Sequence, residues 1–362
     1  MSRLRQSQPI AGENIERITI RMPELFVSFL KDAPLLNAEY TEVKYEAEEA
    51  ITRECSLSTR VSKAIMKCDW AYLAAIVAHN ADRDRYRTLC DWGNWVFPFD
   101  DLFDDGELRA DYESAKTTMD QLLGPFVENV SMCGRQVAQR PSLLRFHDGL
   151  VHRIQGAASK GAYARYLKGM VDYCNGTLEQ VQKVQDDNVP AIEEFLAMRR
   201  RSVCVSALFA LIEYVHNLDI PDYVFENAAI REIEEAGIDI ILMHNDLLSY
   251  YKEESERVPH NLVAVARMSG MTGQEAVSFI GSSIDKRYSD LRKAASLVPL
   301  WGTPVTAEVE KYIQGIRNVI KANLYWSFGS HRYLSEEQKK RWRSRGEIEV
   351  LANPQYLVSL SI

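Results

Sequence analysis

Four aspartates stand together in the sequence F-P-F-D-D-L-F-D-D, which spans residues 97–105. Asp100 and Asp104 are four residues apart, so on a helix their carboxylates share one face. Carboxylates this close repel each other, and both stay ionised only when positive charge lies between them. Hard oxygen ligands without a nearby histidine or cysteine suit Mg²⁺, with Mn²⁺ as a substitute. The spacing predicts a metal site, and an acidic helix end solvated by water is the alternative.

A second set of oxygen ligands lies in H-N-D-L-L-S-Y-Y-K-E-E, residues 244–254. Asn245, Ser249 and Glu253 follow one another at intervals of four residues, which on a helix makes one stripe about 12 Å long. The stripe interrupts the apolar face of the preceding segment, and such local conflicts are typical of functional sites. An amide oxygen, a hydroxyl and a carboxylate on one stripe could chelate a metal ion. The alternative is a helix that reaches the protein surface at residue 245.

Basic side chains that could bind phosphate oxygens occur at three places in the chain. They are the run Arg199, Arg200 and Arg201, then Lys252, and Arg332, which is followed directly by Tyr333. Arginine binds phosphate through two parallel hydrogen bonds and keeps its charge. Each of these residues alone is more typical of a solvated surface. Together with two sets of oxygen ligands, they indicate a site for a polyanion bridged by Mg²⁺.

The composition limits the classes of partner and compartment. The 362 residues carry a formal net charge of −8, which argues against nucleic acid as a partner because duplex binding needs a basic surface. The six cysteines are spaced irregularly without a C-x-x-C pair, as is typical of free thiols in a reducing compartment. The N-terminus lacks the apolar stretch of a signal peptide, and no apolar run approaches the roughly 20 residues that span a bilayer. We therefore expect a cytoplasmic protein without a membrane span.

Long segments with an apolar period of 3.6 residues carry both motifs. These segments are residues 60–79, 83–104, 142–158, 161–186, 191–217, 222–253, 271–297 and 305–329. No segment shows clean strand alternation, so the pattern predicts an all-α protein. No linker rich in glycine, serine or proline divides the chain, which favours one domain over residues 19–335. Residues 1–18 are expected to form a mobile N-terminal segment, and residues 336–362 a charged C-terminal tail.

The two motifs resemble the metal-binding motifs of class I terpene synthases. D-D-L-F-D at 100–104 and N-D-L-L-S-Y-Y-K-E at 245–253 match the two patterns of that family, the second at every defined position. The 145 residues from Asp100 to Asn245, and the 46 residues from Arg199 to Asn245, also agree with the family. The resemblance covers roughly residues 20–335 and is greatest to fungal sesquiterpene cyclases. It implies a single-domain α-helical bundle of the class I terpenoid synthase type.

The resemblance implies a role for each candidate site residue. Three Mg²⁺ ions are implied. Asp100, supported by Asp101 and Asp104, would bind two of them. Asn245, Ser249 and Glu253 would bind the third. The implied diphosphate contacts are Arg199, Lys252, Arg332 and Tyr333, and among these Arg199, Arg332 and Tyr333 are the catalytic candidates. Ser202 and Val203 stand where the family often has an acidic and a small residue, so Arg200 could share the role of Arg199.

The implied activity is Mg²⁺-dependent ionisation and cyclisation of farnesyl diphosphate to a sesquiterpene hydrocarbon or alcohol, with release of diphosphate. A carbocation needs an apolar, closed pocket with aromatic faces. Phe97 and Trp326 are candidates for that lining, with ordinary core packing as the alternative. Ile238 and Ile241 should form part of the floor opposite Phe97, and their bulk favours a C15 substrate over a C20 one.

Two rival functions remain open at this point. A chain-elongating prenyltransferase, which joins allylic and isopentenyl diphosphates, has two Asp-rich motifs, whereas the second motif here is Asn/Ser/Glu. A non-enzymatic acidic helical scaffold would not need both motifs at this spacing. The sequence does not indicate the product, the mode of cyclisation or the oligomeric state, for which a homodimer is one alternative.

Overall fold

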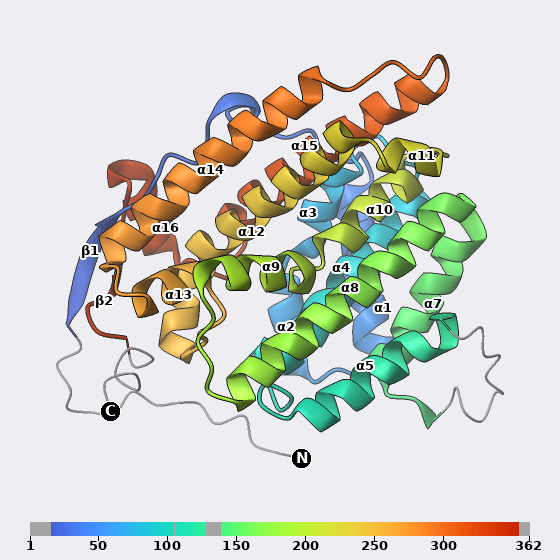
Figure 1. Cartoon of the computed structure of the whole chain (residues 1–362). Helices are drawn as coiled ribbons and strands as arrows, with labels where there is room; N and C mark the ends of the chain where they lie inside the picture. Colours follow the sequence, from blue (N-terminus) through green and yellow to red (C-terminus); the bar gives the residue numbers. More distant parts are fainter. Residues whose placement is uncertain (1–15, 105, 128–138, 355–362) are drawn as a thin grey trace.

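The structure, a computed structural model, describes residues 16–104, 106–127 and 139–354 as a bundle of helices with a small sheet at its edge (Figure 1). The helices are α1 (Tyr40–Glu54), α2 (Thr59–Cys68), α3 (Trp70–Val77), α4 (Arg83–Asp104), α5 (Tyr112–Val127), α7 (Ser142–Ala157), α8 (Lys160–Gln185), α9 (Ile192–Ser202), α10 (Val205–Val215), α11 (Asp222–Phe225), α12 (Ala228–Glu256), α13 (Leu262–Met268), α14 (Gly273–Ser296), α15 (Val305–Gly329) and α16 (Glu336–Arg345), with a 3₁₀ turn at Ser28–Leu30. The predicted all-α fold is confirmed.

Three of the predicted helical segments are divided in the structure, and one of these, 222–253, forms α11 and α12 with Glu226 and Asn227 between them. The segment 60–79 divides at Asp69, whose φ of 53° is left-handed and whose carboxylate caps α3 by accepting the Tyr72 N–H. The segment 191–217 divides into α9 and α10 at Cys204, which has a φ of 59°. A Cβ at Gly176 of α8 would lie 2.6 Å from the backbone nitrogen of Ser202, so α8 packs directly against this break. The break sets the direction in which the end of α9 projects into the bundle.

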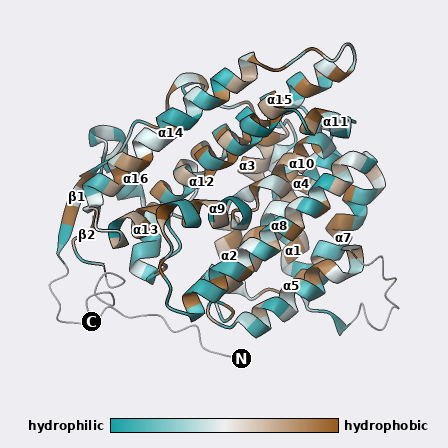
Figure 2. Ribbon diagram, viewed as in Figure 1, coloured by the Kyte–Doolittle hydropathy of each residue, from teal (hydrophilic) through white to brown (hydrophobic). Residues whose placement is uncertain are grey.

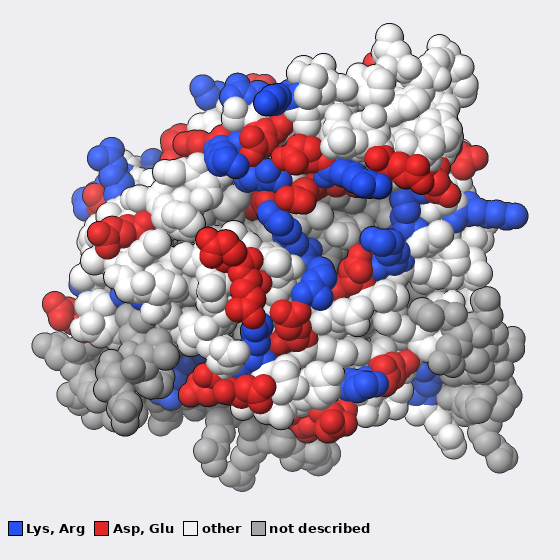
Figure 3. Space-filling view, in the orientation of Figure 1, with Lys and Arg blue, Asp and Glu red and all other residues white. Residues whose placement is uncertain are grey.

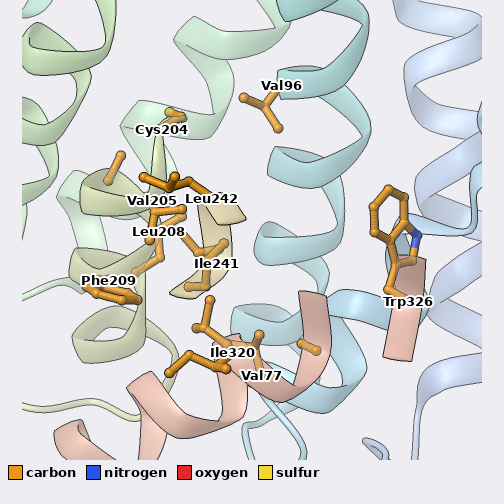
Figure 4. Close-up of a cluster of buried hydrophobic side chains, with 14 of the residues drawn as sticks. Val77, Val96, Cys204, Val205, Leu208, Phe209, Ile241, Leu242, Ile320 and Trp326 are labelled. Carbon is orange, nitrogen blue, oxygen red and sulfur yellow. The ribbon is translucent and has the colours of Figure 1, made fainter. Parts of the chain in front are cut away.

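The long helices carry both hydrophilic and hydrophobic residues, as expected for helices that pack on one side (Figure 2). Helix α12 packs against both α14 and α15, while α3 packs between α4 and α15. Figure 4 shows part of the resulting core, where Val96, Val205, Leu208 and Ile241 come together from α4, α10 and α12. This packing brings together the helices that carry the two motifs.

A two-stranded antiparallel sheet was not predicted from the sequence. Strand β1 (Arg17–Arg21) pairs with β2 (Glu347–Leu351) in a register that places Ile20 opposite Ile348. Apolar and polar residues do alternate in both strands, but over only five residues each, which is too short a pattern to stand out. The pairing joins β2, which lies in the predicted C-terminal tail, to a strand that starts in the expected N-terminal segment and continues into the predicted domain. Residues 1–15, which carry most of the expected mobile segment, lie outside the described residues.

Two further features bear on the sequence predictions. The charged segment after residue 335 begins with α16, whose first turn has a capping box formed by Ser335 and Gln338. Across the described part of the chain, none of the helices is both long and apolar enough to cross a membrane.

Candidate active site

Both motifs face one cavity inside the helix bundle. The cavity has a volume of about 110 Å³ and is lined by Trp70, Leu73, Ala74, Leu89, Trp92, Gly93, Val96, Phe97, Asp100, Asp104, Arg199, Val203, Cys204, Val205, Leu208, Ile241, Asn245, Glu253, Val319, Asn323, Arg332 and Tyr333. Eight of the residues selected from the sequence as metal, diphosphate or aromatic contacts line it: Phe97, Asp100, Asp104, Arg199, Asn245, Glu253, Arg332 and Tyr333. The other candidates, Asp101, Arg200, Ser249, Lys252 and Trp326, do not line it. The cavity therefore combines apolar walls with the polar groups of both motifs.

The acidic motif places Asp100 and Asp104 on the cavity side of α4. The Asp100 carboxylate accepts a hydrogen bond of 2.8 Å from the Tyr173 hydroxyl, and the Asp104 carboxylate accepts one of 2.8 Å from the Gln180 amide. Burial raises the pKa of Asp100 well above its ordinary value, and the charge of Asp104 raises it further. Burial also raises the pKa of Asp104, against the attraction of Arg199. Arg199 therefore offsets only part of the cost of burying these two carboxylates side by side.

The stripe on α12 is held in place by the side chain of Asn261, which follows the helix. The Asn261 amide donates to Glu253 at 2.8 Å, to Ser249 at 3.3 Å and to the carbonyl oxygen of Asp246 at 2.7 Å. Ser249 is fully buried against Asn261 and does not line the cavity. Burial raises the pKa of Glu253 to about 7, and the neighbouring Asp246 contributes to this shift. Asn245 and Glu253 are the two members of the stripe that face the cavity.

Arg199 and its neighbour Arg200 point in different directions. Arg199 donates to Asp246 at 3.0 Å and to Asn245 at 3.1 Å, so it lies within the site. Arg200 donates instead to Asp239 at 2.6 Å and 2.9 Å. Asp239 also pairs with Arg287 at 2.8 Å. Figure 3 shows basic and acidic side chains interspersed on one face of the molecule. The geometry favours Arg199 over Arg200 as the diphosphate contact.

The segment after α15 closes one side of the cavity. Arg332 donates to Asp101 at 2.7 Å, and its guanidinium lies 5.3 Å from the ring centre of Phe97 and 5.7 Å from that of Trp70. The Tyr333 hydroxyl accepts a hydrogen bond of 3.0 Å from the Asn245 amide. In this conformation, basic and acidic groups of the site therefore neutralise one another.

Lys252 lies outside the cavity lining and pairs with Glu256 at 2.9 Å. Trp326 is buried behind the cavity wall, where it stacks on Trp70 at 4.0 Å between ring centres and donates its indole N–H to the Cys68 carbonyl. Trp326 thus supports the aromatic wall, while Trp70 and Phe97 form its surface.

One of the two residues predicted for the cavity floor does not line the cavity. Ile241 lines the cavity, but Ile238 lines a separate hollow with Phe209 and Tyr312. Three residues on an α-helix correspond to about 300° of rotation, so the two isoleucines point about 60° apart. Leu73, Leu208 and Val319 supply the apolar surface that Ile238 does not.

The oxygen donors of the site suit a hard divalent cation, although their carboxylates are not arranged around a single ion. Among the described residues, no three His, Cys, Asp or Glu side chains lie close enough together to hold a metal ion. Asp100, Asp104, Asn245 and Glu253 nevertheless present oxygen donors to one buried cavity. Oxygen-only donors suit Mg²⁺ or Mn²⁺. A cation there would supply the positive charge that the buried carboxylates lack.

Several residues of the site were missed in the sequence. Tyr173 and Gln180 lie seven residues apart on one buried face of α8, and polar residues on such a face were the available signal. Asp246 pairs with Arg199, accepts the Leu262 N–H at 2.7 Å and stands inside the second motif. Asn261 and Trp70 carry no spacing signal, because each is brought to the site by a turn of the chain.

Comparisons with known proteins identify the family. Residues 91–290 match the family model described as terpene synthase family 2, C-terminal metal binding. The chain is 33% identical over 350 residues to silphinene synthase peniA of Penicillium patulum, covering 95% of this chain and 93% of that protein. It is 30% identical to a (+)-eremophilene synthase of Gibberella fujikuroi, covering 87% and 88% of the two chains.

Solved structures share the fold. A variant of cucumene synthase superposes with a TM-score of 0.74 at 19% identity, covering 85% of this chain and all of that one. Germacradien-4-ol synthase of Streptomyces citricolor superposes with a TM-score of 0.69 at 21% identity, covering 84% and 97% of the two chains. The chain therefore belongs to the terpene synthase family and is a terpene cyclase that acts on a prenyl diphosphate.

Proposed function

We propose that this enzyme ionises farnesyl diphosphate in an Mg²⁺-dependent reaction and cyclises the resulting cation to a sesquiterpene hydrocarbon or alcohol. The observation that carries the proposal is one buried cavity with Asp100, Asp104, Asn245 and Glu253 on its wall, Arg199 and Arg332 beside them, and apolar residues over the rest. The names of its relatives support the C15 substrate, since a "Sesquiterpene synthase 1" of Postia placenta is 28% identical over 301 residues.

The charged residues would act on the diphosphate. Bound Mg²⁺, held by Asp100 and Asp104 and by Asn245, Ser249 and Glu253, would stabilise the negative charge that develops on the leaving diphosphate. Arg199 and Arg332 would bind the diphosphate oxygens, and the Tyr333 hydroxyl would donate a hydrogen bond to them. Because Arg332 is paired with Asp101 and Arg199 with Asp246, binding of the diphosphate has to exchange these partners.

The apolar residues would protect the carbocation. Trp70 and Phe97 offer aromatic faces that stabilise a cation without attacking it. Leu73, Leu208 and Ile241 exclude water from the same cavity. The volume of about 110 Å³ is below the roughly 300 Å³ at which ligand pockets begin. The cavity therefore has to widen on binding, and release of Arg332 from Asp101 is the motion that the contacts favour.

Chain elongation is the rival reaction. That reaction needs a second prenyl diphosphate and a second acidic motif, whereas the second motif here contributes an amide, a hydroxyl and a carboxylate. The cytoplasmic location and the homodimer stay predictions.

The test is incubation of the purified protein with farnesyl diphosphate and Mg²⁺, followed by gas chromatography and mass spectrometry of the volatile products. The proposal expects a C15 hydrocarbon or alcohol together with stoichiometric diphosphate. A parallel reaction with added isopentenyl diphosphate provides the control. Longer prenyl diphosphates in that reaction, without cyclic products in the first, would contradict the proposal.

A further inference from the structure

The two terminal strands meet at the end of α12 that carries the metal stripe. We call the pair β1 and β2, residues 17–21 and 347–351, the terminal ribbon. Figure 1 places it at the edge of the bundle, next to α13 and α16. Ile20, Ile348 and Val350 are buried, and Gln274 of α14 exchanges two hydrogen bonds with the backbone of Arg21. The ribbon is therefore anchored to the bundle and offers a fixed support.

Glu254 joins the last turn of α12 to the ribbon. Its two carboxylate oxygens accept the backbone N–H of Leu351 at 3.0 Å and 3.1 Å, and Arg17 of β1 lies 3.8 Å away. Only 2% of Glu254 is exposed. A buried carboxylate is costly unless it is paired, so this contact fixes the position of the turn.

Arg267 of α13 makes the second connection. It donates to the carbonyl oxygens of Leu351 at 3.0 Å and Ala352 at 2.7 Å, and to the Tyr250 hydroxyl at 2.8 Å. Tyr250 belongs to α12 and follows Ser249 directly. One buried guanidinium thus binds the end of β2 to the turn of α12 that carries the stripe.

Another side of the same turn, about 100° away, belongs to the metal site. Glu253 accepts the Asn261 amide and lines the cavity, whereas its neighbour Glu254 accepts the N–H of Leu351. Helix α12 ends at Glu256, where Arg257 adopts a left-handed φ of 59° and donates its N–H to the carbonyl oxygens of Glu253 and Glu254, so the last turn is closed as one unit. Because Glu253 and Glu254 belong to this one turn, the position of Glu253 depends on the contacts of Glu254 as well as on the Asn261 amide.

We propose that Glu254 and Arg267 are positioning residues, through which the terminal ribbon fixes the metal-binding turn of α12. This inference rests on the proposed function of Asn245, Ser249 and Glu253 as ligands. Groups that orient metal ligands from outside typically change metal affinity by about 10–100-fold when removed. We therefore expect the ribbon to set the affinity for the cation while the diphosphate contacts stay intact.

The experiment measures Mn²⁺ binding to the full-length protein with inorganic diphosphate, by electron paramagnetic resonance of the free ion, so that no turnover is needed. Glu254→Ala and Arg267→Gln should raise the half-saturating Mn²⁺ concentration about 10-fold or more. Glu254→Gln should have a smaller effect, because its amide oxygen still accepts the Leu351 N–H. If Glu254→Ala does not fold, Glu254→Gln and Arg267→Gln carry the comparison.

Arg341→Gln is the matched control. Arg341 of α16 donates to Glu349 and Thr19 of the ribbon, and these hydrogen bonds do not reach α12. This variant should lower the melting temperature like the others and change the Mn²⁺ midpoint less than about twofold, since it leaves the ligand-bearing turn in place. Equal Mn²⁺ midpoints for Glu254→Ala, Arg267→Gln and Arg341→Gln would overturn the positioning role. The ribbon would then contribute to stability alone. Failure of the wild type to bind Mn²⁺ with diphosphate would overturn the proposed function, and the positioning role with it.

Discussion

Arg199→Met removes the guanidinium that neutralises Asp246 and leaves a buried carboxylate without its cationic partner. The Asp246 side chain is fully buried and that of Arg199 is 11% exposed. Removing one partner of a buried ion pair typically costs about 3–5 kcal/mol. The Leu262 N–H still donates to Asp246 at 2.7 Å, so we expect the lower end, about 3 kcal/mol in the free energy of unfolding.

The second substitution, Asp246→Asn, separates the structural role of Arg199 from its functional one. An asparagine in the Arg199→Met background carries no charge and keeps an oxygen for the Leu262 N–H. We expect the double variant to recover about 2 kcal/mol of the lost stability, since the desolvated charge is gone. Binding of diphosphate with Mg²⁺ should stay lost in both variants, because neither has the guanidinium.

The assay is urea unfolding of the wild type, both single variants and the double variant, combined with calorimetric titration of diphosphate. Arg200→Met is the control, because Arg287 still neutralises Asp239 in its absence at 2.8 Å. That variant should lose about 1 kcal/mol or less and still bind diphosphate. The reasoning is refuted if Arg199→Met loses less than about 1 kcal/mol, or if Arg200→Met abolishes diphosphate binding and Arg199→Met does not.

Three further predictions concern the ligands, the substrate and a distant carboxylate. Asn245→Ala or Glu253→Ala should nearly abolish turnover with an unchanged circular dichroism spectrum, and EDTA should do the same reversibly; near-normal rates at limiting Mg²⁺ would contradict the ligand role. Farnesyl diphosphate should exceed geranyl and geranylgeranyl diphosphate in kcat/KM by about tenfold or more, whereas equal use of the C20 substrate would contradict the pocket argument. Burial raises the pKa of Glu48 to about 7, so the folded state gains stability as pH falls from about 7 towards the unfolded value of about 4.3. Glu48→Gln should therefore raise the free energy of unfolding by roughly 1–2 kcal/mol at about pH 8 and by little at about pH 5, and a gain that did not depend on pH would contradict this explanation.

The parts of the site that could be predicted are those set by helical spacing. Asp100 and Asp104, which are four residues apart, and Asn245 and Glu253, which are eight apart, reach the same cavity because these intervals keep side chains on one side of a helix. Ser249 lies between Asn245 and Glu253 on the stripe, but its short side chain is fully buried and accepts the Asn261 amide instead of lining the cavity. Helical periodicity likewise predicted the long segments but not the break at Cys204.

The parts that could not be predicted depend on contacts between distant segments. Asn261 reaches Glu253 because the chain turns back after α12, and no periodic pattern encodes that turn. The terminal ribbon joins opposite ends of the chain through strands of five residues each. The error at Ile238 has a simpler cause, because a rotation of about 60° on one helix separates the cavity from a neighbouring hollow.

The measurement that tests the central claim most directly is a crystal structure of this protein with Mn²⁺ and inorganic diphosphate, with the ions located by anomalous scattering. We predict Mn²⁺ beside Asp100 and between Asn245 and Glu253, with Arg199 and Arg332 on the diphosphate and Arg332 no longer paired with Asp101. Diphosphate bound away from these residues, or Mn²⁺ absent from both motifs at saturating concentration, would contradict the account.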